Sequence, residues 1–277
     1  MASKLFYKLL FNQNGRLFDP QQAGKIICKE IKRQAPIYDV SYEDFEGTNG
    51  SRETNTSFRP FELVLTFDIF YKNEYDKELI LTELYQIVFP GVQYYVTHEL
   101  SPGKRFKVNP SNFEFTEEEN DYSTIEVTFN VPQGHSESLT STLSEFDLAD
   151  EWQFSQNLES ADYEYEFDVS RFQVFNAGDF TIDPREHDLK ITLEGESLGN
   201  ATIFNRTTGD RFIYTPALST NLGQTITIDR VYPKLNGVSR GIDTNLGLIT
   251  LAPGINEIEI QNVANVKSLW DFRYLYK

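Results

Sequence analysis

The sequence predicts a mainly β protein of two domains, and three observations support this fold class. Apolar and polar residues alternate with a period of two in many short segments, which is the pattern of half-buried strands. The turns between these segments are rich in Gly, Asn and Pro, as in sandwiches and barrels. Only one segment, residues 76–89, has its apolar residues at helical spacing. The length of 277 residues, with 39% hydrophobic residues, is enough for two domains with real cores.

The N-terminal half is expected to combine strands with that single helix. Strand alternation is clearest over residues 61–70 and 124–131, whereas residues 25–33 fit either a strand or a basic amphipathic helix. Asp76 is a plausible N-cap of the helix, and Pro90 and Gly91 stop the helical pattern.

The C-terminal half is expected to consist almost entirely of short strands. The alternating segments lie at residues 188–193, 201–204, 224–228 and 256–260. A polar stretch rich in Ser and Thr follows the strand that ends at Val131, so we place the domain boundary there. The predicted domains are residues 1–133 and 134–277.

The charge of the chain is strongly acidic and unevenly distributed. There are 42 Asp and Glu against 25 Lys and Arg, a net charge of -17, which argues against a nucleic-acid binder because phosphate contacts need a basic face. The 63 residues between Lys107 and Arg171 contain 16 carboxylates and no Lys or Arg. This stretch can be a solvated acidic face with a linker, or a calcium site, although EF-hand spacing is missing.

The sequence predicts no catalytic, cofactor-binding or metal-binding residues. The three histidines, His98, His135 and His187, are far apart and are expected at the surface or in turns, and nucleophile, phosphate and zinc motifs are lacking. Cys28 is the one cysteine and is expected to be a buried, unreactive side chain. A pair of carboxylates for glycoside hydrolysis stays possible, but no pair is indicated. The N-terminus does not have the pattern of a signal peptide, and no window is apolar enough for a membrane span.

Several segments, taken in order, resemble the siphophage distal tail proteins (Dit), which form the hub at the tip of long non-contractile phage tails. In the first half these are the strand over residues 25–33, residues 45–50, the start of a long strand at Phe58-Arg59-Pro60, the helix, and residues 102–108. In the second half they are residues 251–258 and the terminal residues 270–276. The resemblance covers nearly the whole chain.

The resemblance implies a β-sandwich or split-barrel-like N-terminal domain with one helix that builds a hexameric ring. It also implies a C-terminal galectin-like β-sandwich of the jelly-roll type. The implied partners are five further copies of the chain, the tail tube protein, the tail-associated or fibre protein (Tal) and, in some members, receptor-binding proteins. Such a hub has no enzymatic activity, cofactor or membrane contact, and DNA passes through it without specific binding. It is made and assembled in the bacterial cytoplasm and ends at the virion tail tip.

Residues 34–58 are expected to form either an internal hairpin or a protruding arm. The segment alternates well, but its tip is too long and polar for a simple core hairpin. We therefore predict an arm that packs on, or adds a strand to, a neighbouring subunit through Tyr38, Val40, Tyr42 and Phe45.

Two other functions stay open from the sequence. A carbohydrate-binding or receptor-binding module is suggested by the sandwich pattern and by the aromatic residues Trp152, Phe154, Tyr163 and Tyr165, and a glycan-degrading enzyme is a third possibility. For a hub, the acidity has a simple use, because a pore lined with carboxylates repels the DNA backbone.

Overall fold

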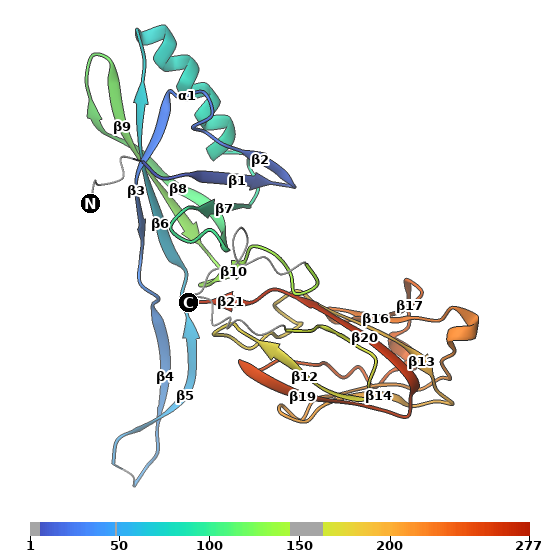
Figure 1. Cartoon of the computed structure of the whole chain (residues 1–277). Helices are drawn as coiled ribbons and strands as arrows, with labels where there is room; N and C mark the ends of the chain where they lie inside the picture. Colours follow the sequence, from blue (N-terminus) through green and yellow to red (C-terminus); the bar gives the residue numbers. More distant parts are fainter. Residues whose placement is uncertain (1–5, 48, 145–162) are drawn as a thin grey trace. The chain divides into compact units, whose positions relative to one another are not determined.

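The computed structural model describes residues 6–47, 49–144 and 163–277 (Figure 1). The chain divides into two compact units, one made of Met1–Ser136 with Lys277 and the other of Glu137–Tyr276. Both units consist mainly of antiparallel strands with a single α-helix among the described residues, so the predicted mainly β fold class is confirmed. No helix in the described ranges is long and apolar enough to cross a membrane.

The first unit is built on a sheet whose main path runs in the order β2-β1-β7-β8-β9-β6-β3. A separate two-stranded sheet, β4-β5, and one helix complete it. The bounds are β1 Leu9–Gln13, β2 Arg16–Phe18, β3 Ile26–Arg33, β4 Tyr38–Asp44, β5 Ser51–Phe58, β6 Phe61–Phe70, α1 Glu74–Val88, β7 Tyr94–His98, β8 Lys104–Glu118 and β9 Tyr122–Val131, after which β10 covers Ser136–Ser138.

Strand β6 is the centre of this sheet. It pairs along its whole length with β9 on one side and from Leu63 to Ile69 with β3 on the other. Alternate side chains such as Leu63, Leu65 and Phe67 are fully buried, which explains why the sequence pattern predicts this strand so well. Residues 26–33 form a strand rather than a helix, which decides between the two interpretations of the sequence over residues 25–33.

Strand β8 joins two parts of the sheet. It pairs with β7 only as far as Val108, and with β9 from Asn109 onward. The β8-β9 register shifts between Pro110 and Asn112. Because proline has no N–H to donate to a ladder, a bulge at this position allows the strand to bend from one partner to the other.

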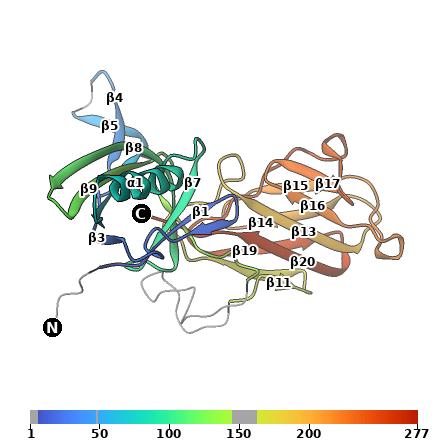
Figure 2. The same cartoon turned by 90° about the horizontal axis from the view of Figure 1, so that it is seen from above.

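Helix α1 covers one face of the sheet (Figure 2), and it begins two residues before the predicted start. Asn73 is the N-cap, because its side-chain oxygen accepts a hydrogen bond from the Asp76 N–H at 3.0 Å. The prediction of Asp76 as N-cap is therefore wrong. The carboxylate of Asp76 instead accepts hydrogen bonds from Lys25 Nζ at 2.6 Å and from the Lys72 N–H at 3.1 Å, and these bonds lower its pKa.

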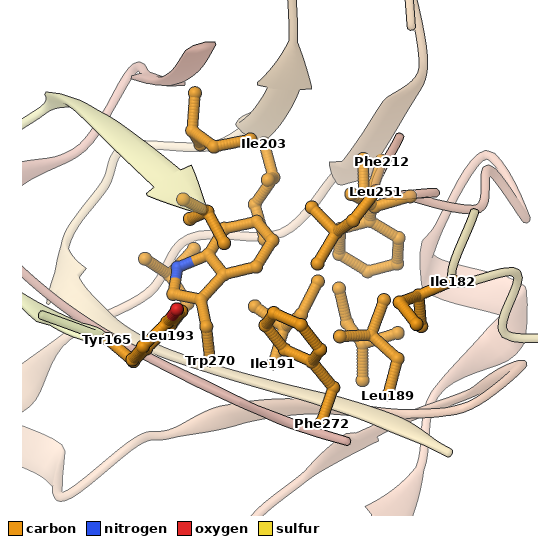
Figure 3. Packing of buried hydrophobic residues seen from close by; sticks show 14 of the residues in the cluster. Tyr165, Ile182, Leu189, Ile191, Leu193, Ile203, Phe212, Leu251, Trp270 and Phe272 are labelled. Atoms are coloured by element: carbon orange, nitrogen blue, oxygen red, sulfur yellow. The ribbon is translucent and has the colours of Figure 1, made fainter. Parts of the chain in front are cut away.

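The second unit is a sandwich of a six-stranded sheet, β11-β20-β13-β16-β17-β18, and a four-stranded sheet, β12-β19-β14-β15. The bounds are β11 Glu166–Phe167, β12 Arg171–Asn176, β13 Leu189–Glu196, β14 Ala201–Asn205, β15 Arg211–Tyr214, β16 Ile226–Asp229, β17 Tyr232–Leu235, β18 Val238–Ser239, β19 Gly254–Gln261, β20 Ala264–Phe272 and β21 Leu275–Tyr276. Side chains from both sheets meet in the core, where Trp270 lies against Leu193 and Ile203 (Figure 3).

Two buried asparagines, Asn205 and Asn256, connect the loop before β19 to the four-stranded sheet through hydrogen bonds. Asn256 Oδ1 accepts hydrogen bonds from the Ala252 N–H at 2.9 Å and from Asn205 Nδ2 at 3.1 Å. Asn205 Nδ2 also donates to the Thr250 carbonyl at 2.7 Å. Fully paired amides of this kind stabilise a loop backbone that has no strand partner of its own.

His98, at the end of β7, is buried in the first unit, so its expected surface position is wrong. Its ring is 5% exposed and stacks on Phe106 with centroids 5.3 Å apart. Neither ring nitrogen has a hydrogen-bond partner among the described residues. Burial, with a smaller contribution from Arg33, lowers the pKa of His98 to about 4. The imidazole is therefore neutral in the folded protein at neutral pH.

We predict that His98 makes the first unit sensitive to acid. Because the pKa is about 4 in the fold and 6.5 in the unfolded chain, the unfolded state binds the extra proton between these values. The free energy of unfolding should be constant above pH 6.5 and fall by roughly 1 kcal/mol per pH unit below it. In His98→Phe, which keeps the aromatic stack, that slope should be lost in denaturant titrations at pH 7.5 and 5.5. An unchanged slope in His98→Phe would contradict the prediction.

Candidate functional site: an exposed hairpin and an acidic sheet face

Strands β4 and β5 form a two-stranded hairpin that belongs to no larger sheet in the described residues (Figure 1). The hairpin lies between β3 and β6 in the chain, with β4 after β3 and β5 before β6. It extends beyond the end of β9, because β9 stops opposite Phe61 at the start of β6. The rings of Tyr38 and Phe58 lie 4.6 Å apart at its base, and Arg59 forms an ion pair with Asp39 at 2.8 Å. The predicted segment is thus a paired hairpin with a defined register.

The four arm residues predicted from the sequence lie on this hairpin or at its tip. Tyr38 is 54% exposed, Tyr42 63% and Phe45 49%, while Val40 is half-buried. Tyr38, Val40 and Tyr42 occupy alternate positions of β4 and so share one face. An isolated two-stranded hairpin is marginally stable in water, and the exposed parts of the Tyr38 and Tyr42 rings give it an apolar surface that contacts solvent.

The face of the sheet β3-β6-β9-β8 that points away from the core is polar and rich in carboxylates. One cross-strand row runs through Glu30, Thr66, Glu126 and Glu114, so three of four neighbours are acidic. Two carboxylates on β6 also lie on this face, Glu62 near one end and Asp68 near the other. Asp68 accepts a hydrogen bond from the Thr124 hydroxyl at 2.7 Å. Lys32 lies on the same face, opposite Val64, and pairs with Glu30, so the five carboxylates leave an excess of negative charge that repels anions.

The acidic stretch found in the sequence is divided by the structure. Its first part forms the end of β8 and the turn into β9, which carry Glu117, Glu118, Glu119 and Asp121. Much of the rest falls on residues 145–162, which lie outside the described ranges. Among the described residues there is no group of three or more His, Cys, Asp and Glu placed to hold a metal ion.

The two lysines of β3 are paired with carboxylates of the same chain. Lys29 Nζ lies 3.3 Å from Asp68 and Lys32 Nζ lies 2.9 Å from Glu30. These two lysine side chains remain 53% and 57% exposed, respectively. The positive charges of these two lysines are therefore partly neutralised within the chain itself.

The remaining candidate residues have structural positions. Cys28 is buried, and desolvation raises the pKa of its thiol to about 12, so the thiolate is not formed at neutral pH. His135 is buried, against expectation, and His187 is half-buried in a turn.

The aromatic residues that suggested a carbohydrate site do not form an exposed platform where they are described. Tyr163 stacks on Phe175 with ring centroids 4.5 Å apart, and Tyr165 is buried and donates to the Phe175 carbonyl at 2.8 Å. Trp152 and Phe154 lie outside the described residues.

Comparisons with known proteins agree with this fold. Residues 7–131 match the family model described as the phage tail protein RIFT-related domain. The chain is similar to the crystal structure of the Dit protein (gp 19.1) of phage SPP1, described as a paradigm of the hub adsorption apparatus in phages that infect Gram-positive bacteria. The identity is 10%, the TM-score is 0.67, and the match covers 97% of this chain and 99% of that one.

Two structures of the phage p2 baseplate in its activated conformation also match. The complex with Ca gives 11% identity and a TM-score of 0.47 over 97% of both chains, and the complex with Sr gives 11% and 0.45 over 96% and 97%. No protein of curated function matches the sequence. The family model and the fold of the SPP1 protein confirm the resemblance to siphophage tail proteins, while the low identities leave the individual contacts of this chain to be argued from its own residues.

We predict that the acidic row weakens the first unit in the isolated chain. Glu114 and Glu126 are directly opposite each other, and like charges in that position are destabilising. Glu114→Gln should raise the free energy of unfolding by about 0.5 kcal/mol at low salt. Glu118→Gln is the matched control, because Glu118 pairs with Lys77 at 3.0 Å and its neutralisation should lower stability. Equal effects of the two variants in denaturant titrations would show that the row carries no net repulsion.

Proposed function

The chain carries a phage tail protein RIFT-related domain over residues 7–131, and from this premise we propose that it is the structural hub at the distal end of a long non-contractile phage tail. The fold shared with the SPP1 hub protein over the whole length of both chains is the observation that carries the proposal. The role is structural, with no catalytic step. The proposal places the chain in the virion tail tip, in association with other tail proteins.

In this proposal six copies form a ring. One side of the ring joins the tail tube protein, the other side joins the tail-associated or fibre protein, and DNA passes through the centre. A ring of identical chains uses a heterologous interface, in which one surface of each copy meets a different surface of the next. The first unit offers such surfaces in the exposed hairpin and in the open edges of its sheet.

The hairpin β4-β5 is proposed as the arm that clasps the neighbouring copy. As a two-stranded element with exposed aromatic rings, it gains stability only if another surface covers it. A neighbouring copy can supply either an apolar surface for Tyr38 and Tyr42 or a strand edge for the backbone. The arm would then lock the ring without contributing to the core of its own unit.

Removal of the arm tests this part of the proposal. A variant with residues 36–58 replaced by a two-residue Asn-Gly turn should keep the folded core, because the β3-β6 pairing is complete without the arm. Light scattering should show hexamers for the wild-type chain and monomers or small oligomers for the variant. Tyr38→Ser with Tyr42→Ser is the milder change and should weaken the ring at least tenfold, since each buried aromatic contributes more than 1 kcal/mol. A variant without the arm that still forms hexamers would overturn the arm, but not the ring.

The acidic face of β3-β6-β9-β8 is proposed as the wall of the channel. DNA must pass through the hub without being retained, and a wall of carboxylates repels phosphates, whereas Lys and Arg would bind them one after another. Of the two faces of this sheet only one is free for that purpose, because the other carries Leu63, Leu65 and Phe67 into the core. In a ring, the row through Glu126 and Glu114 would repeat in every copy.

Charge reversal on this face tests the channel. Glu62→Lys with Glu126→Lys should leave the ring intact and slow genome ejection from a phage that carries the variant, because every copy then offers cations to the passing phosphates. The matched control makes the same change of charge in the second unit, with Glu186→Lys and Glu257→Lys. Ejection kinetics followed by fluorescence of a DNA dye should respond only to the first pair, and unchanged kinetics in both would exclude the face as the channel wall.

A further inference from the structure

The outer face of the four-stranded sheet in the second unit carries two rows of planar side chains. The first row crosses all four strands and consists of Arg171, Glu259, Phe204 and Arg211. The second row consists of Gln173, Glu257 and Arg206, whose backbone N–H donates to the Glu257 carbonyl just beyond the end of β14. The side chains between these positions point the other way and are buried in the core, among them Val174, Ile258, Ile203 and Phe212.

The two rows hold more positive than negative charge. Three arginines against the two glutamates leave a net charge of +1, on a chain whose total is -17. This part of the sheet therefore attracts anions, which the acidic chain as a whole repels.

Glu259 holds two of the arginines side by side. Its Oε1 accepts a hydrogen bond from Arg171 Nη2 at 3.1 Å, and its Oε2 lies 3.6 Å from Arg206 Nη1. The carboxylate is 17% exposed, whereas the side chains of Arg171 and Arg206 are 71% and 51% exposed. One guanidinium is enough to neutralise one carboxylate. The second is in excess, and N–H groups of both guanidiniums reach solvent at neighbouring positions.

The two guanidiniums belong to a small pocket, which we call the arginine pocket. Its volume is about 230 Å³, and its lining consists of Arg171, Phe172, Gln173, Arg206, Glu257 and Ile258. Pockets for drug-sized ligands measure roughly 300–1,000 Å³, so this one suits a single small unit of a ligand.

The polar groups of the arginine pocket select the chemistry of that unit. Two neighbouring guanidiniums bind the oxygens of a phosphate or a carboxylate through charge-assisted, bidentate hydrogen bonds. Glu257 repels such a group, but its carboxylate accepts hydrogen bonds from hydroxyls, and the Gln173 amide can donate and accept. A bare anion therefore fits the pocket only in part. A saccharide unit with an anionic group and several hydroxyls can use all four side chains.

Arg211 extends the positive surface beyond the arginine pocket. Its guanidinium lies over the ring of Phe204, with 4.0 Å between the guanidinium carbon and the ring centroid. Stacking on a ring holds a guanidinium flat without using its in-plane N–H donors. An anionic polymer that continues from the pocket along the first row would thus meet a further cation.

We propose that the arginine pocket binds a saccharide unit that carries a phosphate or a carboxylate. The inference goes beyond the proposed hub, because it concerns the outer face of the second unit and needs no second copy of the chain. One unit would bind weakly. A polymer of such units could occupy the pockets of several copies at once, which raises the overall affinity without any new contact.

Saturation-transfer difference NMR on the whole chain tests the arginine pocket. The probes are glucose 6-phosphate and glucuronate, with glucose as the neutral sugar. At least one anionic sugar should bind in the millimolar range, and the one that binds identifies the anionic group; glucose should bind at least about fivefold more weakly. Arg171→Gln with Arg206→Gln should weaken binding at least about tenfold, because the charge-assisted hydrogen bonds are lost.

A matched control makes the same change elsewhere in the second unit. Arg185 and Arg240 are also exposed and pair with Asp183 and Asp243, respectively. Arg185→Gln with Arg240→Gln should leave binding of the anionic sugars unchanged.

A conservative variant separates the shape of the guanidiniums from their charge. Arg171→Lys with Arg206→Lys keeps both charges but loses the planar fork, so the anionic sugar should bind at least about threefold more weakly than to the wild-type chain. This variant also serves if the Gln pair unfolds the sheet, because Glu259 then still has a cation beside it. Thermal unfolding of each variant shows whether the second unit is folded.

Five outcomes would overturn the inference. These are no binding of either anionic sugar at tens of millimolar, equal binding of glucose, binding that the Gln pair leaves unchanged, a Lys pair that binds as tightly as the wild-type chain, and inorganic phosphate that displaces the sugar as well as the sugar phosphate does. A self-association of the chain that the Gln pair abolishes, without any sugar binding, would instead identify the face as a protein contact. The absence of sugar binding would leave the proposed hub unaffected.

Discussion

The pairing of β6 with both β3 and β9 is the interaction on which the first unit depends. It holds the centre of the sheet and buries one face of β6, and it leaves the opposite face polar. It also aligns the two strands that continue beyond the sheet as the hairpin β4-β5. The hairpin and the acidic face are therefore consequences of one antiparallel ladder, and a substitution that weakens β6 would disturb both.

Strand β6 and the strands of the second unit could be predicted from the sequence because their alternation is regular and one face is buried. The predicted segment 61–70 coincides with β6, the segment 256–260 falls inside β19, and the segment 188–193 begins one residue before β13. The helix was placed two residues late because both Asn73 and Asp76 have side chains that can cap a helix, and local sequence does not decide between them. His98 was misplaced because its burial depends on Phe106, eight positions away on the next strand.

The candidate site was only partly visible in the sequence. The hairpin could be predicted because the alternation of its sequence is strong, and the structure adds that β4 and β5 pair with no other strand among the described residues. Its role as an arm stays a prediction. The acidic face could not be found, because it takes Glu30, Glu126 and Glu114 from three strands whose neighbours are fixed only by the fold. Net charge indicated that an acidic surface exists, and strand order assigns part of it to one face.

The proposed hub function explains why the first unit has features that are unfavourable in the isolated chain. Glu114 faces Glu126, and aromatic rings on the hairpin are exposed to water, and both features are unfavourable for a free monomer. The proposed ring would relieve the exposure of the rings, because neighbouring copies would cover the hairpin. The repulsion between Glu114 and Glu126 would remain, since the proposed channel wall needs free carboxylates to repel DNA. The free chain should therefore gain stability on assembly, which makes the ring a favoured state rather than one that needs a separate clamp.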